Sequence, residues 1–552
     1  MGPTMMQHPL TTQMIVRRGE RLFPESRVVT YDGGEYSEAS FARIAARARS
    51  LASALGALGL APGDRIGTFA WNNDTHLEAY LAVPAGGYVL HTLNIRLFAD
   101  QLAYIVEHAE DRAILVEASL LPLLEPVLSR QSCVEQLIVF GGKADAVAGF
   151  KGAIHYYEDL IAGHDPIEQW PEVAENSAAV VCYTSGTTGN PKGVVYSHRS
   201  IFLHSLGSMG VDAFAISNRD NILMLPPMFH ANAWGLPFSG WFAGSDMVMP
   251  GPHLQPDKIA AMAAATKPTL TATVPTILND LLQLHARSPI EMGSFRTIIG
   301  GGSAVSPVLI ERVKDAWGVD IVQGWGMTET SPMCVVSFPP RDATPEAAVE
   351  WRAKSGRPVA GMEVRAVDDE GRPVAEDGRT VGRLQLRGPW VAAGYYRQPA
   401  QDATLSADGW LETGDVGTID ERGYVLLTDR TKDLIKSGGE WISSVDLENR
   451  IARFPGIAEV AVVAVADSRW EERPLAIVVA QEGQEPDFGE IRRYLAGQIA
   501  KFMIPEYWAC VPGLPKTSVG KIDKKFLRGE VQSGTLPYLT ETGFGHAEHV
   551  YE

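Results

Sequence analysis

The first two thirds of the chain alternate between short apolar runs and longer amphipathic segments. Apolar runs of four to six residues predict buried β-strands at 65–70, 113–116, 136–140 and 178–182. Between these runs, apolar residues recur at helical spacing. Strands that alternate with helices predict parallel sheets covered by helices, and hence an α/β fold.

Two helices are predicted in the first hundred residues. The first spans residues 37–58, with Ser37 as its N-cap and Gly59 just after its end. The second spans residues 77–83 and ends before Pro84, because proline disrupts a helix interior.

The pattern changes after about residue 356. Short strands bounded by Gly and Asp predict a small antiparallel region at 361–365, 382–386 and 423–427. A separate α+β domain is expected beyond it, with helices at 445–454 and 488–498 and strands at 459–466 and 475–480. We expect a large domain over 1–428, a hinge at 429–432 and a small mobile domain over 433–552.

Composition narrows the class of protein. A chain of 552 residues is too long for one core. A formal net charge of −18 argues against nucleic-acid binding driven by phosphate neutralisation. The four cysteines lack CxxC spacing, which indicates reduced thiols rather than a metal site or a disulfide framework. No apolar run reaches the roughly 18–20 residues that span a bilayer, and no signal peptide is visible, so we expect a cytoplasmic protein.

The segment from Tyr183 to Gly193 is rich in glycine and hydroxyl side chains and contains Lys192. Glycine lets backbone N–H groups approach an anion, while the hydroxyls and the lysine add donors and positive charge. It is not the common P-loop, because Pro191 precedes the lysine and Gly193 follows it. From these residues alone, a polyphosphate site and an ordinary surface turn both remain open.

Three further motifs follow in order. They are 323–330 (QGWGMTET), Thr413-Gly414-Asp415 with 429–432 (DRTK), and 516–521 (KTSVGK). With the loop at 184–193, they make residues 10–530 resemble the adenylate-forming superfamily of acyl-CoA synthetases, adenylation domains and luciferases. Residues 227–234 and 432–448 are most similar to bacterial fatty-acyl-CoA synthetases. The resemblance implies that a carboxylate attacks the α-phosphate of ATP to give acyl-AMP and pyrophosphate, and that CoA then releases AMP.

The resemblance also implies roles for individual residues at the nucleotide. The phosphates would be held by Thr184, Ser185, Gly186, Thr187, Thr188, Gly189 and Lys192. Mg²⁺ would bind Glu329 and Thr184, although a Thr-Glu pair taken alone is more often a helix start. Trp325 would lie against adenine, where many relatives have Tyr. Its neighbours Gln323, Gly324 and Thr328, together with Trp234 and Gly302, would complete the nucleotide site. Asp415 and Arg430 would hold the ribose.

Lys521 is implied as the catalytic lysine, together with Glu329 and Thr184 as catalytic residues. Taken alone, Lys521 would be interpreted as one charge on a basic, solvated C-terminal tail. Lys432 occupies the hinge position, and Lys436, Gly438, Gly439 and Trp441 would serve the CoA step.

The acyl pocket is implied to include His230, Ala231, Trp234, Gly301 and Gly324. The expected substrate is a medium- or long-chain fatty acid, with ATP, Mg²⁺ and CoA as the other reactants and cofactors. A short, thioether-bearing or aromatic acid, transfer to an amine, and a non-catalytic nucleotide-binding regulator stay open. The resemblance leads us to expect a homodimer. We expect no binding of nucleic acid and no integral membrane contact.

Overall fold

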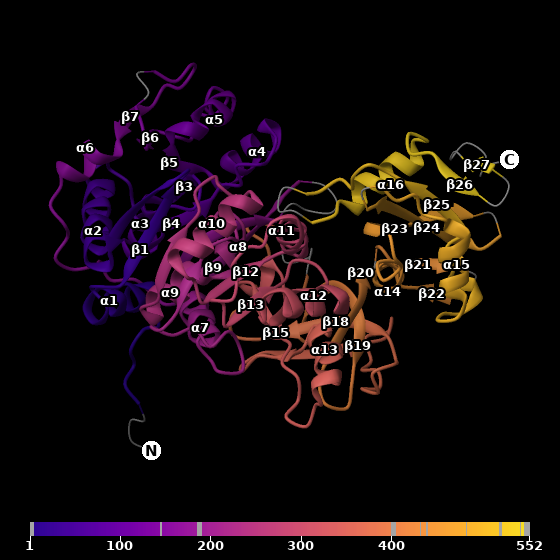
Figure 1. Cartoon of the computed structure of the whole chain (residues 1–552). Helices are drawn as coiled ribbons and strands as arrows, with labels where there is room; N and C mark the ends of the chain where they lie inside the picture. Colours follow the sequence, from indigo (N-terminus) through magenta and orange to yellow (C-terminus); the bar gives the residue numbers. More distant parts are fainter. Residues whose placement is uncertain are drawn as a thin grey trace.

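The computed structural model describes residues 5–143, 146–184, 190–398, 404–430, 432–437, 440–467, 469–481, 483–517, 521–540 and 543–545, with the backbone alone at 440–441, 539–540 and 543–545. A large body formed by the first four fifths of the chain stands beside a smaller C-terminal one (Figure 1). Among the described residues, no helix combines the length and apolarity needed to cross a membrane.

The first sheet of the large body has seven strands in the order β7-β6-β5-β3-β4-β8-β9. Its strands are β3 (Arg65–Phe69), β4 (Val89–Thr92), β5 (Asp111–Glu117), β6 (Gln136–Phe140), β7 (Ala153–Tyr156), β8 (Ala178–Thr184) and β9 (Lys192–Ser197). All neighbours are parallel except β8 and β9, which form an antiparallel hairpin. Helices of this region are α2 (Phe41–Ala57), α3 (Asp74–Ala85), α4 (Ala99–Ala109), α5 (Leu121–Leu128), α6 (Tyr157–Ala162) and the short η1 (Ala118–Leu120).

The second sheet has nine strands in the order β16-β15-β14-β13-β12-β10-β11-β1-β2. They are β1 (Arg27–Asp32), β2 (Glu35–Ser40), β10 (Asn221–Leu223), β11 (Asp246–Met249), β12 (Leu270–Thr273), β13 (Thr297–Gly300), β14 (Ile321–Gly326), β15 (Met333–Val336) and β16 (Arg357–Pro358). The six central strands, from β14 to β1, are parallel, and the strands outside them pair antiparallel. The carboxyl ends of the parallel strands therefore share one edge, where ligands bind in open α/β sheets.

Helices and short turns complete the large body. They are α1 (Thr12–Leu22), α7 (His198–Ser208), α8 (Ala231–Trp234), α9 (Leu236–Ala243), α10 (Pro256–Thr266), α11 (Pro275–Arg287), α12 (Pro307–Trp317), η2 (Thr328–Thr330) and α13 (Pro345–Ala353). Trp241 of α9 is fully buried, stacks on Phe41 at 4.0 Å and donates to the carbonyl of Val16. The core thus runs continuously between the helices of both sheets.

A four-stranded antiparallel sheet follows, with β17 (Glu363–Val367), β18 (Gly382–Arg387), β19 (Leu411–Ile419) and β20 (Val425–Arg430). The C-terminal body contains β21 (Ile435–Ser437), β22 (Glu440–Ile442), β23 (Ile457–Asp467), β24 (Glu471–Ala480), β25 (Tyr507–Cys510), β26 (Tyr538–Thr540) and β27 (Gly543–Gly545), with α14 (Ser444–Ile451), α15 (Phe488–Ala496), η3 (Lys501–Met503) and α16 (Lys524–Gln532). The predicted α/β fold, with a large N-terminal and a small C-terminal domain, is confirmed.

Two predicted helix starts and one helix end are wrong. Ser37 lies in β2, opposite Thr30, and α2 starts at Phe41 with Ser40 accepting from the Arg43 N–H. Pairing with β1 therefore overrides the local helix signal. α3 starts at Asp74 instead of residue 77, and it continues through Pro84 to Ala85. Pro84 gives up its own intrahelical N–H bond, and the helix continues for only one residue beyond it.

Candidate functional site

The segment predicted to bind phosphate starts and ends in the β8–β9 hairpin. In that hairpin Thr184 pairs directly with Lys192. The Lys192 ammonium lies 4.7 Å from the centre of the Tyr395 ring. Ser185, Gly186, Thr187, Thr188 and Gly189 lie outside the described residues. The structure therefore sets a hydroxyl and a cation side by side at the two ends of this segment.

Glu329 lies beside these two residues. It is the second residue of η2, its side chain is buried, and the Tyr395 hydroxyl donates to its Oε1 at 2.6 Å. Thr328 begins η2, and its carbonyl accepts from the Tyr196 hydroxyl of β9 at 2.7 Å. Tyr395 thus joins Lys192 to Glu329, and nothing in our sequence interpretation had singled it out. Burial and the neighbouring carboxylate raise the pKa of Tyr395, so its hydroxyl remains a donor.

The residue types at this point fit a magnesium ion. Mg²⁺ takes oxygen ligands, usually one or two carboxylates together with substrate phosphates. Glu329 supplies a buried carboxylate, and Thr184 supplies a hydroxyl on the adjoining strand β8. A buried carboxylate that faces a polyphosphate requires a neutralising cation, which this pair could hold.

Asp415 stands at the centre of a second polar group. It lies in β19, opposite Arg430 of β20, rather than in a simple turn. The indole N–H of Trp325 donates to Oδ2 at 3.0 Å, and Arg430 Nε lies 2.6 Å from Oδ1. Burial raises the pKa of Asp415, while the Arg430 charge and the Trp325 hydrogen bond oppose that rise. Trp325 therefore holds Asp415 through its ring nitrogen.

Lys521 reaches this same region from the C-terminal body. Its loop is closed by a bridge between Lys516 and Ile522 and by the Thr517 N–H donating to the Lys521 carbonyl at 2.6 Å. A Cβ at Gly302 would lie 3.2 Å from Lys521 Cε, so the lysine side chain passes close to the backbone at this glycine. Burial and the nearby Arg430 charge lower the pKa of Lys521 to about 8, with Asp415 acting in the opposite direction.

Trp234 sits on an unusual backbone segment. Residues 231–235 all have positive φ, from 43° at Ala231 to 79° at Gly235, so α8 is a left-handed turn. Non-glycine residues in this region each cost about 1–2 kcal/mol. A Cβ on Gly301 would lie 3.1 Å from the Trp234 ring, and one on Gly302 would lie 3.8 Å from it. The strained turn therefore holds the indole against the glycines that follow β13.

His230 immediately precedes this turn. Burial lowers its pKa to about 3, and the charges of Lys521 and Arg96 act in the same direction. The imidazole is therefore neutral at physiological pH and lies beside two cations. Gly324 of β14 lies close by, since its carbonyl would be 3.2 Å from a Cβ on Gly301.

The remaining predicted residues are placed less directly. Gln323 uses its amide to accept from the Val305 N–H and to donate to the carbonyls of 353 and 354, so its side chain is engaged within the protein. Lys432 is exposed just after β20, and Lys436 lies in β21 with its N–H donating to Glu472. Gly438 and Gly439 lie outside the described residues, and only the backbone of Trp441 is described.

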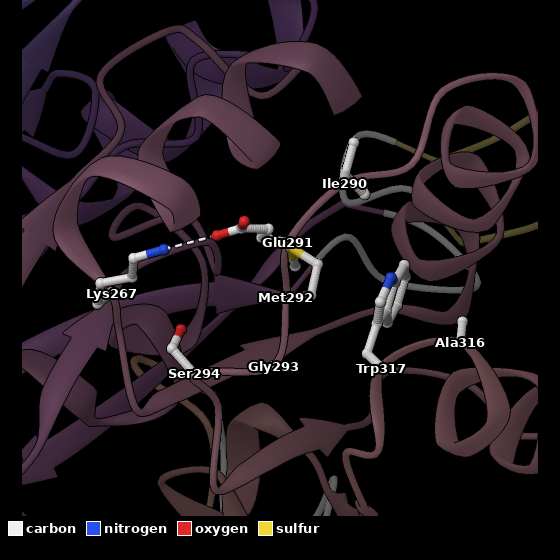
Figure 2. Close-up of a pocket in the computed structure, with 8 residues that line it drawn as sticks. All are labelled: Lys267, Ile290, Glu291, Met292, Gly293, Ser294, Ala316 and Trp317. Carbon is white, nitrogen blue, oxygen red and sulfur yellow. Dashed lines mark hydrogen bonds and ion pairs between the residues drawn. The ribbon is translucent and has the colours of Figure 1, made fainter.

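A separate surface pocket of about 370 Å³ lies near the end of α10 (Figure 2). It is lined by Lys267, Ile290, Glu291, Met292, Gly293, Ser294, Ala316 and Trp317. Lys267 and Glu291 form an ion pair at 2.8 Å across it. The residues predicted for the nucleotide and the acid do not line it, so this pocket is distinct from the candidate site.

Comparison with known proteins identifies the family of the chain. The family model of the AMP-binding enzymes matches residues 16–396, and that of the AMP-binding enzyme C-terminal domain matches residues 446–521. The chain is 42% identical to the 3-methylmercaptopropionyl-CoA ligase of Ruegeria pomeroyi, covering 95% of this chain and 98% of that protein. It is 41% identical to the medium-chain-fatty-acid–CoA ligase of Ectopseudomonas oleovorans, covering 95% and 96%.

Among solved structures, the anthranilate CoA ligase AuaEII in complex with anthranoyl-AMP has a TM-score of 0.86 at 25% identity, covering 96% of this chain and 99% of that one. Its fold and the family matches extend over both bodies of the chain. The chain therefore belongs to the AMP-binding enzyme family, as an AMP-forming acyl-CoA ligase.

Proposed function

We propose that this acyl-CoA ligase activates a linear aliphatic acid of medium chain length, with Mg²⁺ bound at Glu329 and Thr184. The observation that carries the proposal is the Trp234 indole, which packs against Gly301 and Gly302 beside the Lys521 side chain. An apolar wall next to a cation suits a carboxylate with a hydrocarbon tail. Each buried CH₂ contributes about 0.8 kcal/mol.

In the first half-reaction, a carboxylate oxygen of the acid forms a bond to the α-phosphorus of ATP. The bond from that phosphorus to the bridging oxygen breaks, and pyrophosphate leaves. Lys192, Thr184 and the segment between them would hold the β- and γ-phosphates. Lys521 would place its ammonium against the carboxylate and the α-phosphate, where negative charge accumulates in the transition state.

Asp415 would accept hydrogen bonds from the ribose hydroxyls, and Trp325 and Arg430 would hold its carboxylate in place. Burial raises the pKa of the Asp415 carboxyl, and these two partners act against that rise. Trp325 would in addition lie against the adenine. Mg²⁺ would supply charge neutralisation at the phosphates.

In the second half-reaction, the thiol of CoA attacks the acyl carbon, the bond to the AMP oxygen breaks, and the thiol proton leaves to solvent. We assign this step to a second orientation of residues 433–552, reached by a turn at residues 429–432. The chain leaves the four-stranded sheet at Arg430 and enters the C-terminal sheet at Ile435, so the linker between them is short. A single mobile domain could present Lys521 in the first step and other residues in the second, which makes domain closure a suitable device.

A second candidate substrate is 3-methylmercaptopropionate. It is favoured by the Ruegeria relative, and its tail is that of a short linear acid in which sulfur replaces one CH₂. The Phe214 ring would lie 4.0 Å from a Cβ on Gly324, so an aromatic side chain stands directly behind that glycine. This placement favours tails of limited length.

An acid panel tests the proposal. Acid-dependent exchange of pyrophosphate into ATP would be measured for linear acids from C4 to C16, for 3-methylmercaptopropionate and for benzoate, and AMP release would then be measured with and without CoA. We expect the highest kcat/KM between C6 and C10, with a clear requirement for CoA. A maximum at 3-methylmercaptopropionate would select the second candidate. A maximum of kcat/KM at benzoate or at C16 would contradict the proposal, and so would transfer of the acyl group to an amine without CoA. Absence of pyrophosphate exchange with every acid would favour a non-catalytic role.

A further inference from the structure

The left-handed turn at 231–235 is attached to the phosphate-binding strand through buried side chains. The Asn232 Oδ1 accepts from the Cys182 thiol at 3.4 Å, and the Tyr80 hydroxyl lies 3.3 Å from the same oxygen. Tyr80 also donates to the carbonyl of Met228, four residues before Asn232. Asn232, Cys182 and Tyr80 are all buried, so water does not compete for these bonds.

Cys182 lies in strand β8, the strand that ends at Thr184. It precedes Thr184 by two residues, and alternate residues of a strand share a face. Its sulfur also lies 3.4 Å from the Thr92 hydroxyl of β4. Burial raises the pKa of Cys182 to about 11, so the thiol remains protonated and can donate.

The same sulfur connects to the carboxylate side of the site. The Tyr196 hydroxyl approaches Cys182 and donates to the carbonyl of Thr328, which precedes Glu329. Buried contacts therefore run from the Trp234 turn, through Cys182, to η2. The Cys182 thiol of β8 therefore contacts both the turn, at Asn232, and β9, at Tyr196.

We propose that Asn232 and Cys182 are positioning residues that fix the Trp234 turn to strand β8, so that β8 sets the shape of the acid site. Asparagine tolerates the left-handed conformation better than most residues. Its side chain would have the second task of anchoring the turn to β8. The inference rests on the acid-binding role of Trp234 in the proposed function, and concerns the way in which the turn is held.

The test separates the two tasks of Asn232. Asn232→Gly keeps the backbone free to adopt the left-handed conformation and removes only the anchor. Cys182→Ala removes the donor, and Cys182→Ser retains one. Steady-state KM values for ATP and for the acid that wild-type enzyme prefers would be measured by pyrophosphate release, with thermal unfolding as a check on folding.

We expect Asn232→Gly and Cys182→Ala each to raise the KM for the acid at least tenfold and to change the KM for ATP less than threefold. Cys182→Ser should stay within threefold of wild type. The double variant Asn232→Gly/Cys182→Ala should be no worse than the poorer single variant, because both lose the same bond. The matched control is Cys133→Ala, since that half-buried thiol bonds to the Val106 carbonyl away from the turn.

The inference fails if Asn232→Gly keeps the wild-type KM for the acid, because asparagine would then serve only the backbone conformation. It also fails if the KM values for acid and ATP rise together, or if Cys182→Ser is as poor as Cys182→Ala. If Asn232→Gly does not fold, the comparison of Cys182→Ala with Cys182→Ser decides the matter. Wild-type enzyme without acid-dependent activity would instead contradict the proposed function.

Discussion

Replacement of Trp325 by Phe tests how the proposed nucleotide site is built. The substitution keeps an aromatic face for adenine and removes the N–H that donates to Asp415 at 3.0 Å. Asp415 is only 3% exposed, so water replaces the lost donor poorly. A hydrogen bond to a charged group contributes about 1.5–3 kcal/mol, which corresponds to a roughly 10- to 150-fold change in affinity. Because Arg430 remains 2.6 Å from the carboxylate, we expect the lower part of that range, about 10- to 30-fold.

The same variant should change the pH dependence of ATP use. The Trp325 hydrogen bond lowers the pKa of Asp415 against the effect of burial, so its loss raises that pKa. With a higher pKa, more of the carboxyl is neutral at a given pH below neutrality, and a neutral carboxyl is a poorer acceptor for ribose. As the pH is lowered, the variant should therefore lose affinity for ATP at a higher pH than wild type does.

The assay is ATP–pyrophosphate exchange at saturating acid, with the KM for ATP measured between pH 5.5 and 8.5. The matched control is Trp317→Phe, because Trp317 is 9% exposed against 8% for Trp325 and its ring nitrogen donates to His285 at 3.2 Å, beside the separate pocket. We expect the control to keep the wild-type KM. A KM for ATP in Trp325→Phe within twofold of wild type over this whole range would refute the reasoning.

Three further outcomes follow from the same geometry. The kcat/KM for adenylation should fall as the pH rises through about 8, because Lys521 loses its proton there. Conversion of supplied acyl-AMP to acyl-CoA should show no such decrease, and coincident pH profiles in the two assays would contradict this prediction. Phe214→Ala should move the optimum of the acid panel to longer chains by removing the ring behind Gly324, and an unchanged optimum would place the tail elsewhere. Glu329→Gln should raise the Mg²⁺ concentration needed for half-maximal pyrophosphate release at least tenfold without loss of thermal stability, and an unchanged requirement would count against a metal contact.

Much of the fold follows from patterns in the chain, and the exceptions have physical causes. Apolar runs mark the strands β3, β5, β6 and β8 closely, because both faces of these strands are buried. Ser37 and Ser40 are both good N-caps by residue type. The choice between them depends on pairing with strand β1, which the local helix propensity does not include. Asp415 likewise reads as a turn residue, although it belongs to the longest strand of the antiparallel sheet.

The sequence motifs single out residues that lie close together in the structure, whereas residues that only tertiary packing brings to the candidate site were missed. Lys521 and Asp415 are distant in sequence, and their proximity in the structure agrees with the order of the motifs. Tyr395 was missed because an aromatic residue after glycine has no signal of its own, and only the fold brings it to Glu329. The left-handed turn at Trp234 was also missed, since alanine and tryptophan give no warning of positive φ.

The central claim is that Lys521, delivered by the C-terminal body, is the cation that drives adenylation. The direct measurement compares Lys521→Ala with wild type in two assays: acid-dependent pyrophosphate release, and formation of acyl-CoA from supplied acyl-AMP. Loss of one such charge contact costs roughly 10²–10³ in rate. We predict a fall of that size or greater in pyrophosphate release, with acyl-CoA formation within about threefold of wild type. Near-normal pyrophosphate release by the variant, or an equal loss in both assays, would contradict the account.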